Sequence, residues 1–288
     1  MLWATVRRLW KWFLHLVTGT SELERICLQD IPAYQRTIKI EEYFKESRQL
    51  ASAGLSARLA NLPADADLDE ICAAVLNAKV VDNAAVDAAL RESLGHMVAV
   101  SSLVATLDRA RAPYDSDNAE HEAMLMRLWA LLRPNVLLTA RKSLDWQEIG
   151  FQGRDPATDF RSMGVLGLSN MLELCEQYPR CAQTILLDTT SHSNWFGFAI
   201  TSINITADVL KQLKDKQLNS YFYREGATSA NFTALYAEYF MRFNKLWAAR
   251  NPENVMSFGP IRDEFLAEMH ARAAADTLQG LTPEVFDG

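Results

Sequence analysis

The spacing of apolar residues along the chain is helical almost from end to end. The pattern predicts helices over residues 41–53, 64–79, 83–111, 113–134, 160–178, 182–187, 198–214, 230–250 and 261–277. Prolines stand at several of their boundaries: a helix follows Pro63 and Pro113, and a helix stops at Pro134 and Pro179. Alternating apolar and polar residues, the mark of a half-buried strand, form no run of useful length. The sequence therefore predicts an all-α fold.

Three of these helices allow more detailed expectations. The helix over 83–111 contains Gly95, and the pattern leaves open whether it breaks there. The helix over 113–134 is expected to start at an aspartate or serine cap. Its buried stripe is expected to be Met124, Leu128, Leu131 and Leu132. In the helix over 230–250, the expected core stripe is Tyr236, Tyr239, Phe240, Phe243 and Trp247.

The first seventeen residues form an amphipathic pattern of a different kind. At helical spacing one broad face carries Leu2, Val6, Leu9, Trp10, Phe13, Leu16 and Val17. The opposite face carries Arg7, Arg8, Lys11 and His15. A membrane span needs about 20 mostly apolar residues, which this charged segment does not offer. A basic, tryptophan-rich helix is typical of the membrane surface, and the alternative is that its apolar face packs on the protein's own core.

Composition narrows the class of protein. The chain has 288 residues, is 49% hydrophobic and carries a net charge of −7, so a globular protein with a substantial core is expected. The acidic balance argues against a nucleic-acid partner, because phosphate binding needs a basic surface. The four cysteines stand apart from one another and lack clustered histidines, which predicts buried reduced thiols rather than a zinc site.

The usual catalytic motifs do not occur in the sequence. It contains neither the glycine-rich phosphate loop G-x-x-x-x-G-K-[ST] nor the G-x-S-x-G nucleophile elbow. The histidines are scattered singly, and Glu120-His121 has no second metal ligand at suitable spacing. Conventional small-molecule catalysis is therefore not indicated.

One polar stretch, residues 150–160, ends directly before Arg161. Thr158 or Asp159 is a suitable cap, which predicts that Arg161 falls in the first turn of the next helix. A cation is poorly placed there, because the helix N-terminus already carries partial positive charge. Either nearby acids pair with it, with Glu148, Asp155 and Asp159 as the candidates, or the guanidinium has a chemical role.

The segment that contains Arg161 resembles the signature of the ELMO domain. Its matching residues are Trp146, Gly150, Phe151, Gln152, Pro156, Asp159, Phe160, Arg161 and Gly164. The resemblance extends to "LVTGTSELERIC", "YDSDNAEHEAMLMRLW" and "GFAITSINIT" and so covers almost the whole chain. One departure is Ser162, where the family usually has glycine. We call residues 146–164 the signature segment.

The resemblance implies an organisation of the chain. It predicts an amphipathic membrane-associating helix over 1–18 and an N-terminal helical region over 19–114. The ELMO domain, a multi-helix bundle on which the N-terminal helices pack, is expected over 115–275, followed by a tail over 276–288. The sequence itself suggests a boundary near Pro113–Asp117, where a turn-rich stretch separates two blocks of predicted helices.

The resemblance also implies a function. Short ELMO proteins are GTPase-activating proteins for Arf and Arf-like small GTPases, and the family's catalytic arginine falls on Arg161. The chain would then need no cofactor of its own, because the GTP-bound partner supplies the nucleotide and Mg²⁺. Larger ELMO proteins serve as scaffolds, so the alternative is a non-catalytic GTPase-binding adaptor. A third hypothesis, a membrane-bound structural protein, rests on residues 1–17 alone.

The remaining signature residues have expected supporting roles. Gly150, Gly153 and Pro156 would shape a tight loop, which Trp146 and Phe151 would anchor in the core. Gln152 would hold the arginine or touch the partner, and Asp159 would cap the following helix or pair with the arginine. The expected location is cytoplasmic, at the surface of an intracellular membrane such as the endoplasmic reticulum, Golgi, mitochondria or lipid droplets.

Overall fold

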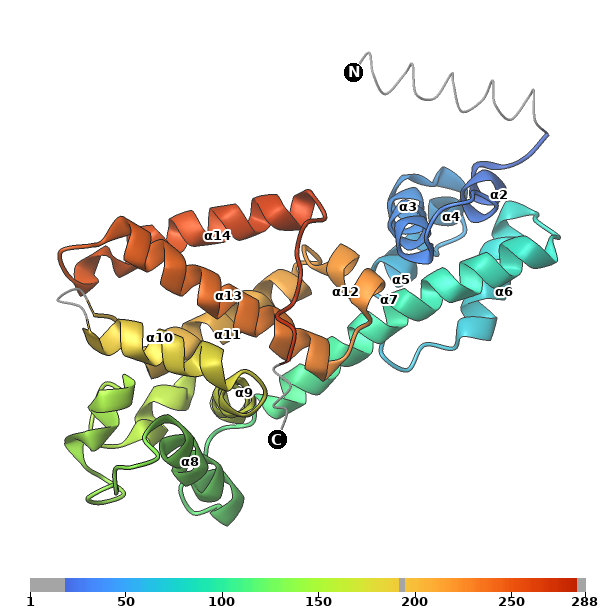
Figure 1. Ribbon diagram of the computed structural model, residues 1–288. Helices are drawn as coiled ribbons and strands as arrows, with labels where there is room; N and C mark the ends of the chain where they lie inside the picture. Colours follow the sequence, from blue (N-terminus) through green and yellow to red (C-terminus); the bar gives the residue numbers. More distant parts are fainter. Residues whose placement is uncertain (1–18, 192–194, 284–288) are drawn as a thin grey trace. The chain divides into compact units, whose positions relative to one another are not determined.

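The computed structural model describes residues 19–191 and 195–283 (Figure 1). All regular structure in these ranges is helical and none of it is a strand, which confirms the predicted all-α class. The helices form two compact units. The first contains the described residues up to Leu103 together with Phe222–Ala227, and the second contains the rest. This division lies inside a long helix, whereas the sequence suggested the turn-rich stretch at Pro113–Asp117.

The first unit is built mainly from short helices. They are α2 (Glu22–Cys27), α3 (Ala33–Glu46), α4 (Arg48–Ser52), α5 (Ser56–Ala60) and α6 (Leu68–Lys79). The longer α7 (Ala84–Ala110) starts in this unit and runs through Gly95 without a break. Ser47 divides the helix expected over 41–53, because its hydroxyl accepts a hydrogen bond from the Leu50 amide and caps α4.

The second unit contains helices of 13 to 22 residues and three 3-10 turns. Its elements are α8 (Ala119–Leu132), η1 (Leu144–Ile149), η2 (Pro156–Arg161), α9 (Gly164–Gln177), α10 (Pro179–Ser191), α11 (Phe198–Lys214), α13 (Ser229–Arg250), η3 (Val255–Ser257) and α14 (Phe258–Ala274). A short helix that the sequence pattern missed, α12 (Asn219–Glu225), connects α11 with the loop before α13.

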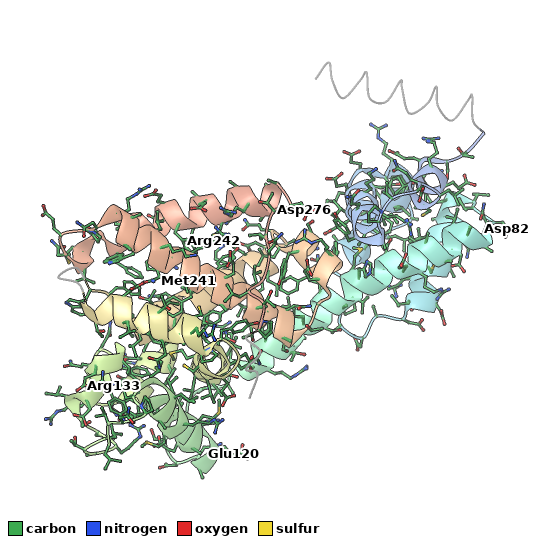
Figure 2. The ribbon with its side chains drawn as sticks, viewed as in Figure 1. Asp82, Glu120, Arg133, Met241, Arg242 and Asp276 are labelled. Atoms are coloured by element: carbon green, nitrogen blue, oxygen red, sulfur yellow. The ribbon has the colours of Figure 1, made fainter. Side chains whose placement is uncertain are left out.

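The centre of the second unit is α9, which packs against α8, α10, α11 and α13. In Figure 1 it lies between α8 on one side and the α10–α13 layer on the other. Side chains fill the space between these helices (Figure 2). A helix that is apolar around most of its circumference is expected at such a position. The last residue of the signature segment, Gly164, is the first residue of α9, so this segment is attached directly to the core.

Two details of the expected core can be compared with the structure. The aromatic stripe on α13 is buried, which confirms that prediction. On α8 the buried stripe is Leu125, Leu128, Trp129 and Leu132. The expected members Met124 and Leu131 are only half-buried. The α8 cap is Asn118 rather than an aspartate or serine, because the Asn118 Oδ1 accepts from the Glu120 amide at 2.8 Å.

The amphipathic segment over residues 1–18 lies outside the described residues, so its face and its partner stay predictions. Within the described ranges, none of the helices combines the length and the apolar character that crossing a membrane requires.

Candidate functional site

The signature segment folds as two 3-10 turns joined by a short loop. η1 ends at Ile149, Gly150 reverses the chain, and η2 begins at Pro156 with the Asp155 side chain as its cap. Arg161 is the last residue of η2, and α9 begins three residues later at Gly164. The expectation that Arg161 lies in the first turn of the long helix is therefore wrong. The separate cap at Asp155 and the left-handed backbone of Gly164 keep η2 apart from α9.

An aromatic series anchors the signature segment in the core. Trp146, Phe151 and Phe160 are all buried. The ring centroids of Trp146 and Phe151 are 5.8 Å apart and those of Phe151 and Phe160 are 5.7 Å apart, each pair edge to face. On the far side of the series, Trp129 of α8 lies 5.4 Å from Trp146. Such pairs each contribute about 0.5–1.5 kcal/mol beyond simple burial, so the loop is rigidly attached.

Gly150 makes a backbone contact that only glycine allows. Its φ is +85°, and a Cβ there would lie 2.7 Å from the Cα of Gly197, just before α11. The Gly150 carbonyl also accepts a hydrogen bond from the Ile200 amide at 3.3 Å. The turn after η1 is thereby fastened to the start of α11, a segment distant in sequence.

Gly164 holds the other end of the signature segment. Its φ is +54°, and a Cβ would overlap the Ala112 carbonyl oxygen and lie 2.6 Å from that of Arg111. The Val165 amide donates to Ala112 at 2.9 Å. The Arg111 guanidinium donates to the Ser162 carbonyl at 3.1 Å. Ser162 itself has φ −86° and ψ −41°, which any residue adopts, so the backbone does not require the family's glycine there.

A hydrogen bond to the Asp159 side chain closes the loop between η1 and η2. Its carboxylate accepts a hydrogen bond from the Gln152 amide at 2.9 Å. Burial raises the pKa of Asp159, and the Gln152 hydrogen bond and the nearby Arg161 charge oppose this rise. The expectation that Asp159 caps the helix after it is wrong, since η2 is capped by Asp155 and α9 has no side-chain cap. The Gln152 side chain makes no hydrogen bond to any described residue, and so it does not hold Arg161.

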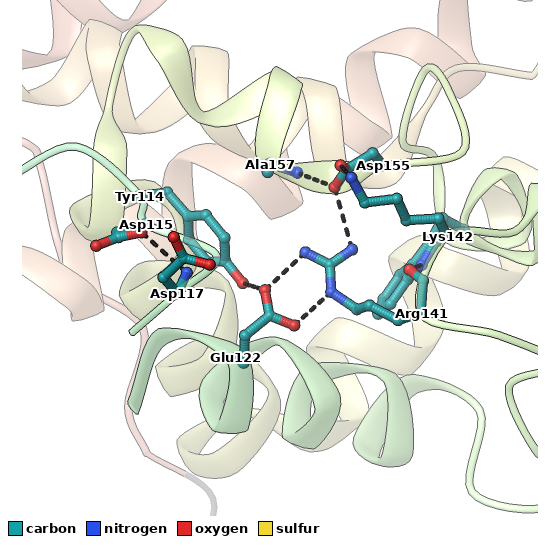
Figure 3. A network of polar contacts seen from close by, with 9 residues as sticks. Tyr114, Asp115, Asp117, Glu122, Arg141, Lys142, Asp155 and Ala157 are labelled. Carbon is teal, nitrogen blue, oxygen red and sulfur yellow. Dashed lines mark hydrogen bonds and ion pairs between the residues drawn. The ribbon is translucent and has the colours of Figure 1, made fainter. Parts of the chain in front are cut away.

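A charged network that the sequence reasoning missed supports η2 from α8 (Figure 3). Arg141 binds both carboxylate oxygens of Glu122, and its Nη1 lies 3.1 Å from Asp155. Lys142 pairs with the other oxygen of Asp155 at 2.8 Å. Tyr114 donates its hydroxyl hydrogen to Glu122 at 2.7 Å. Nothing in the spacing of these residues along the chain could have indicated that they meet.

The network shifts the ionisation of its members. Hydrogen bonds from Arg141 hold the pKa of Glu122 below its ordinary value. Partial burial tends to raise the pKa of Asp155, but bonds from Lys142, the Ala157 amide and Arg141 outweigh it, so that pKa is also lowered. Both carboxylates are therefore ionised at neutral pH, and the network keeps its full complement of charges.

Arg161 differs from this network in having an unengaged side chain. It is exposed, and its guanidinium makes no hydrogen bond or ion pair with a described residue. The acids considered as its partners are engaged elsewhere: Glu148 binds Arg133 at 2.6 Å, and Asp155 binds Arg141 and Lys142. Asp159 acts on Arg161 only through its nearby charge. The guanidinium is therefore available to an external anion.

Most of the described arginines form a hydrogen bond or an ion pair, so the lack of both at Arg161 is unusual in this protein. Among the described residues, only Arg48, Arg154 and Arg161 have neither a hydrogen bond nor an ion pair. Two of these three lie in the signature segment, and Arg154 is exposed like Arg161. The acidic chain thus presents, within eight residues of each other in sequence, two guanidinium groups that have no hydrogen bond or ion pair with a described residue.

The cysteines and two of the histidines in the described ranges have structural surroundings. All four cysteines are free and buried, which confirms the prediction of buried thiols. His96 contacts Thr37 at 2.9 Å, and His121 accepts from the Asp115 amide at 3.1 Å. Within the described residues, the acids, histidines and cysteines form no cluster able to hold a metal ion.

Comparison with known proteins agrees with the family that the signature segment indicates. Residues 105–262 match the model of the ELMO/CED-12 family. The chain is 36% identical to ELMO domain-containing protein B of Dictyostelium discoideum over 264 residues, covering 90% of this chain and 92% of that protein. It is 35% identical to ELMO domain-containing protein 2 of Mus musculus, covering 90% and 89% of the two chains. No solved structure matches the chain. The chain belongs to the ELMO/CED-12 family.

Proposed function

We propose that this protein is a GTPase-activating protein for Arf or Arf-like small GTPases and that Arg161 is its catalytic residue. The observation that carries the proposal is the unpaired, exposed guanidinium of Arg161 at the end of a rigidly anchored segment. An uncompensated arginine held at the end of a short helix is suited to enter the nucleotide site of another protein.

The chemistry follows from phosphoryl transfer. During GTP hydrolysis negative charge spreads over the γ-phosphoryl oxygens and the leaving bridge oxygen. A guanidinium supplied in trans stabilises that charge and accelerates hydrolysis by about 10³–10⁵ in known cases. Its planar fork can contact two oxygens at once, which a lysine ammonium does not reproduce. The GTPase contributes the GTP, the Mg²⁺ and the attacking water, so this chain needs no cofactor.

Membrane association completes the proposal. The predicted amphipathic helix over residues 1–18 would hold the protein on the cytoplasmic surface of an intracellular membrane. Its basic face suits anionic lipid headgroups, and its tryptophans suit the interface. A GTPase on the same surface would then meet Arg161 at a raised local concentration.

The direct test is single-turnover GTP hydrolysis by a panel of Arf and Arf-like proteins, with this chain added at increasing concentration. Arg161→Ala is expected to lower the maximal stimulated rate at least about 100-fold. Arg161→Lys should fail nearly as badly, because it keeps the charge and loses the fork. Thermal unfolding should hardly move, since Arg161 has no partner to lose.

A matched control is available in the first unit. Arg48 is exposed and unpaired like Arg161, but it lies outside the signature segment, so Arg48→Ala should keep full activity. If Arg161→Ala still stimulates hydrolysis like the wild type, the catalytic role is wrong. If the wild-type chain binds GTP-loaded partners and accelerates none of them, the protein is an adaptor instead.

A further inference from the structure

Both ends of η2, the helix that carries Arg161, are connected to one residue of α8. At the start of η2, Asp155 caps the helix and is held by Arg141, which in turn binds Glu122. Near the end of η2, the Phe160 ring stacks on the Tyr114 ring with centroids 5.1 Å apart. The Tyr114 hydroxyl donates to the same Glu122 carboxylate (Figure 3). Glu122 therefore joins the two supports.

We propose that Glu122 and Arg141 are positioning residues for Arg161, acting through Asp155 at one end of η2 and through Tyr114 and Phe160 at the other. This inference rests on the proposed function, because it concerns the placement of the same arginine. It assigns a role to Tyr114, Glu122 and Arg141, none of which is part of the signature segment.

The geometry of the network favours a positioning role over a general stabilising one. The Arg141 guanidinium contacts both oxygens of Glu122 and one oxygen of Asp155, so its plane is determined by three acceptor atoms. The side chains of Glu122 and Arg141 are each 25% exposed and that of Asp155 is 20% exposed. A bidentate ion pair at a half-buried site restrains the orientation of both side chains, whereas a single ion pair at an exposed site contributes little.

The restraint matters because η2 is short and contributes little stability of its own. Asp155 Oδ1 accepts from the Ala157 amide at 3.2 Å as well as from Arg141, so moving Arg141 disturbs the cap itself. Phe160 lies directly before Arg161, and the stacking of its ring on that of Tyr114 restrains this end of η2. A displacement of about 1 Å of a catalytic group can cost about 100-fold in rate.

The decisive variant is Arg141→Lys, which keeps the positive charge and cannot contact all three acceptor atoms at once. We expect the maximal stimulated rate of hydrolysis to fall at least about tenfold, while the half-saturating concentration of this chain changes less than about twofold. Glu122→Gln should behave similarly. Tyr114→Phe keeps the ring on Phe160 and loses only the hydroxyl, so its loss of rate should be smaller than that of either.

The matched control is Arg127→Lys. Arg127 of α8 pairs with Glu176 of α9, so it also links α8 to its neighbour, but it lies outside the network. This variant should keep the wild-type rate. A second measurement is hydrogen exchange of the unliganded chain, in which the amides of Ala157 and Thr158 should exchange about tenfold faster in Arg141→Lys than in the wild type.

Each outcome decides a different question. A wild-type chain that accelerates no GTPase removes the proposed function and the positioning role with it. An active wild type with Arg141→Lys equally active overturns the positioning role alone. If the rate falls equally in Arg141→Lys and Arg127→Lys, or if the half-saturating concentration rises instead of the rate falling, the network is structural or partner-binding and the inference is wrong.

Discussion

The carboxylate of Asp159 accepts a hydrogen bond from the backbone amide of Gln152 at 2.9 Å, across the loop that separates η1 from η2. This bond joins two residues of the family signature, and neither of them contacts Arg161 through a hydrogen bond. These two signature residues therefore act by closing the loop that leads to η2 and Arg161.

A pair of substitutions at Asp159 separates its hydrogen bond from its charge. Asp159→Ala removes the acceptor for the Gln152 amide and should lower the free energy of unfolding by about 1 kcal/mol or more. Asp159→Asn keeps an acceptor oxygen and removes a charge that burial disfavours. It should therefore be at least as stable as the wild type at pH 7. Urea unfolding of the three chains measures both differences.

The pH dependence of this comparison has a definite sign. The folded pKa of Asp159 is raised above its ordinary value of 3.8, so protonation favours the folded state. The contribution to stability is full below that ordinary value and is lost as the pH rises through the folded pKa. The advantage of Asp159→Asn should consequently vanish in acid and appear on approaching neutral pH. An advantage that grows in acid would contradict the assignment.

Gly150→Ala is expected to be strongly destabilising. The backbone φ of +85° disfavours a side chain, and the added Cβ would meet the backbone of Gly197 and Phe198. Strain and overlap together should cost about 3 kcal/mol or more. Gly153→Ala, three residues later, is the control, because a Cβ there meets nothing within 4 Å and should cost no more than about 0.5 kcal/mol. Urea unfolding followed by tryptophan fluorescence checks both, and equal midpoints would contradict the contact.

The sequence predicts those parts of the fold that depend on residues close together along the chain. Long amphipathic helices were predicted well, since each turn repeats the same signal, and α11 begins and ends where the spacing indicated. The 3-10 turns were missed because segments of only three to six residues show no hydrophobic period. Arg161 was consequently assigned to the wrong helix, although the resemblance to the family signature singles the residue out.

The parts of the site that were not predictable are contacts between distant segments. Gly150 touches Gly197, and Arg141, in the loop before η1, reaches Glu122 on α8. A local pattern reports which face of an element is buried and not which residue of another element it meets. The choice between a paired and a free Arg161 was undecided for the same reason. It required knowing that Glu148 and Asp155 bind other cations.

Ser162→Gly tests the one departure from the family signature. The Ser162 backbone is in the ordinary right-handed helical region, so glycine gains no strain relief there. It should instead lower the free energy of unfolding by about 0.5 kcal/mol, because glycine has more freedom to lose on folding. Stimulated hydrolysis should stay within about twofold of the wild type. A large gain in rate would show that the serine side chain obstructs the partner.

The N-terminal helix is expected to bind anionic lipid vesicles. Burying its large apolar side chains at about 1.5–3 kcal/mol each is ample for reversible binding. The intact chain should float with the vesicles, and Leu9→Glu combined with Phe13→Glu should abolish flotation. The control combines Val80→Glu with Leu137→Glu, at side chains that are 90% and 93% exposed in the protein. Flotation of all three chains would contradict a role of the N-terminal apolar face in membrane binding, and aggregation or loss of helicity in the N-terminal variant would show that this face packs on the core.

Arg154 is expected to contribute to partner association rather than to catalysis. It is exposed, unpaired and part of the same loop as Gln152, but it precedes η2, whereas Arg161 ends it. A GTP-loaded partner presents negative charge, and this chain, with a net charge of −7, needs local cations to approach it. Arg154→Glu should raise the half-saturating concentration roughly tenfold at low ionic strength and leave the maximal rate nearly unchanged.

The salt dependence distinguishes this role from a structural one. Salt screens the attraction between exposed charges, which at 0.1 M salt is largely lost beyond about 10 Å. The difference between Arg154→Glu and the wild type should therefore shrink as salt is added. Arg48→Glu reverses an exposed, unpaired arginine outside the signature segment and should leave both parameters alone. If Arg154→Glu lowers the maximal rate at every salt concentration, the residue acts on the reaction itself. If it changes neither parameter, the GTPase approaches from a direction that Arg154 does not face, and Arg161 alone supplies the cation.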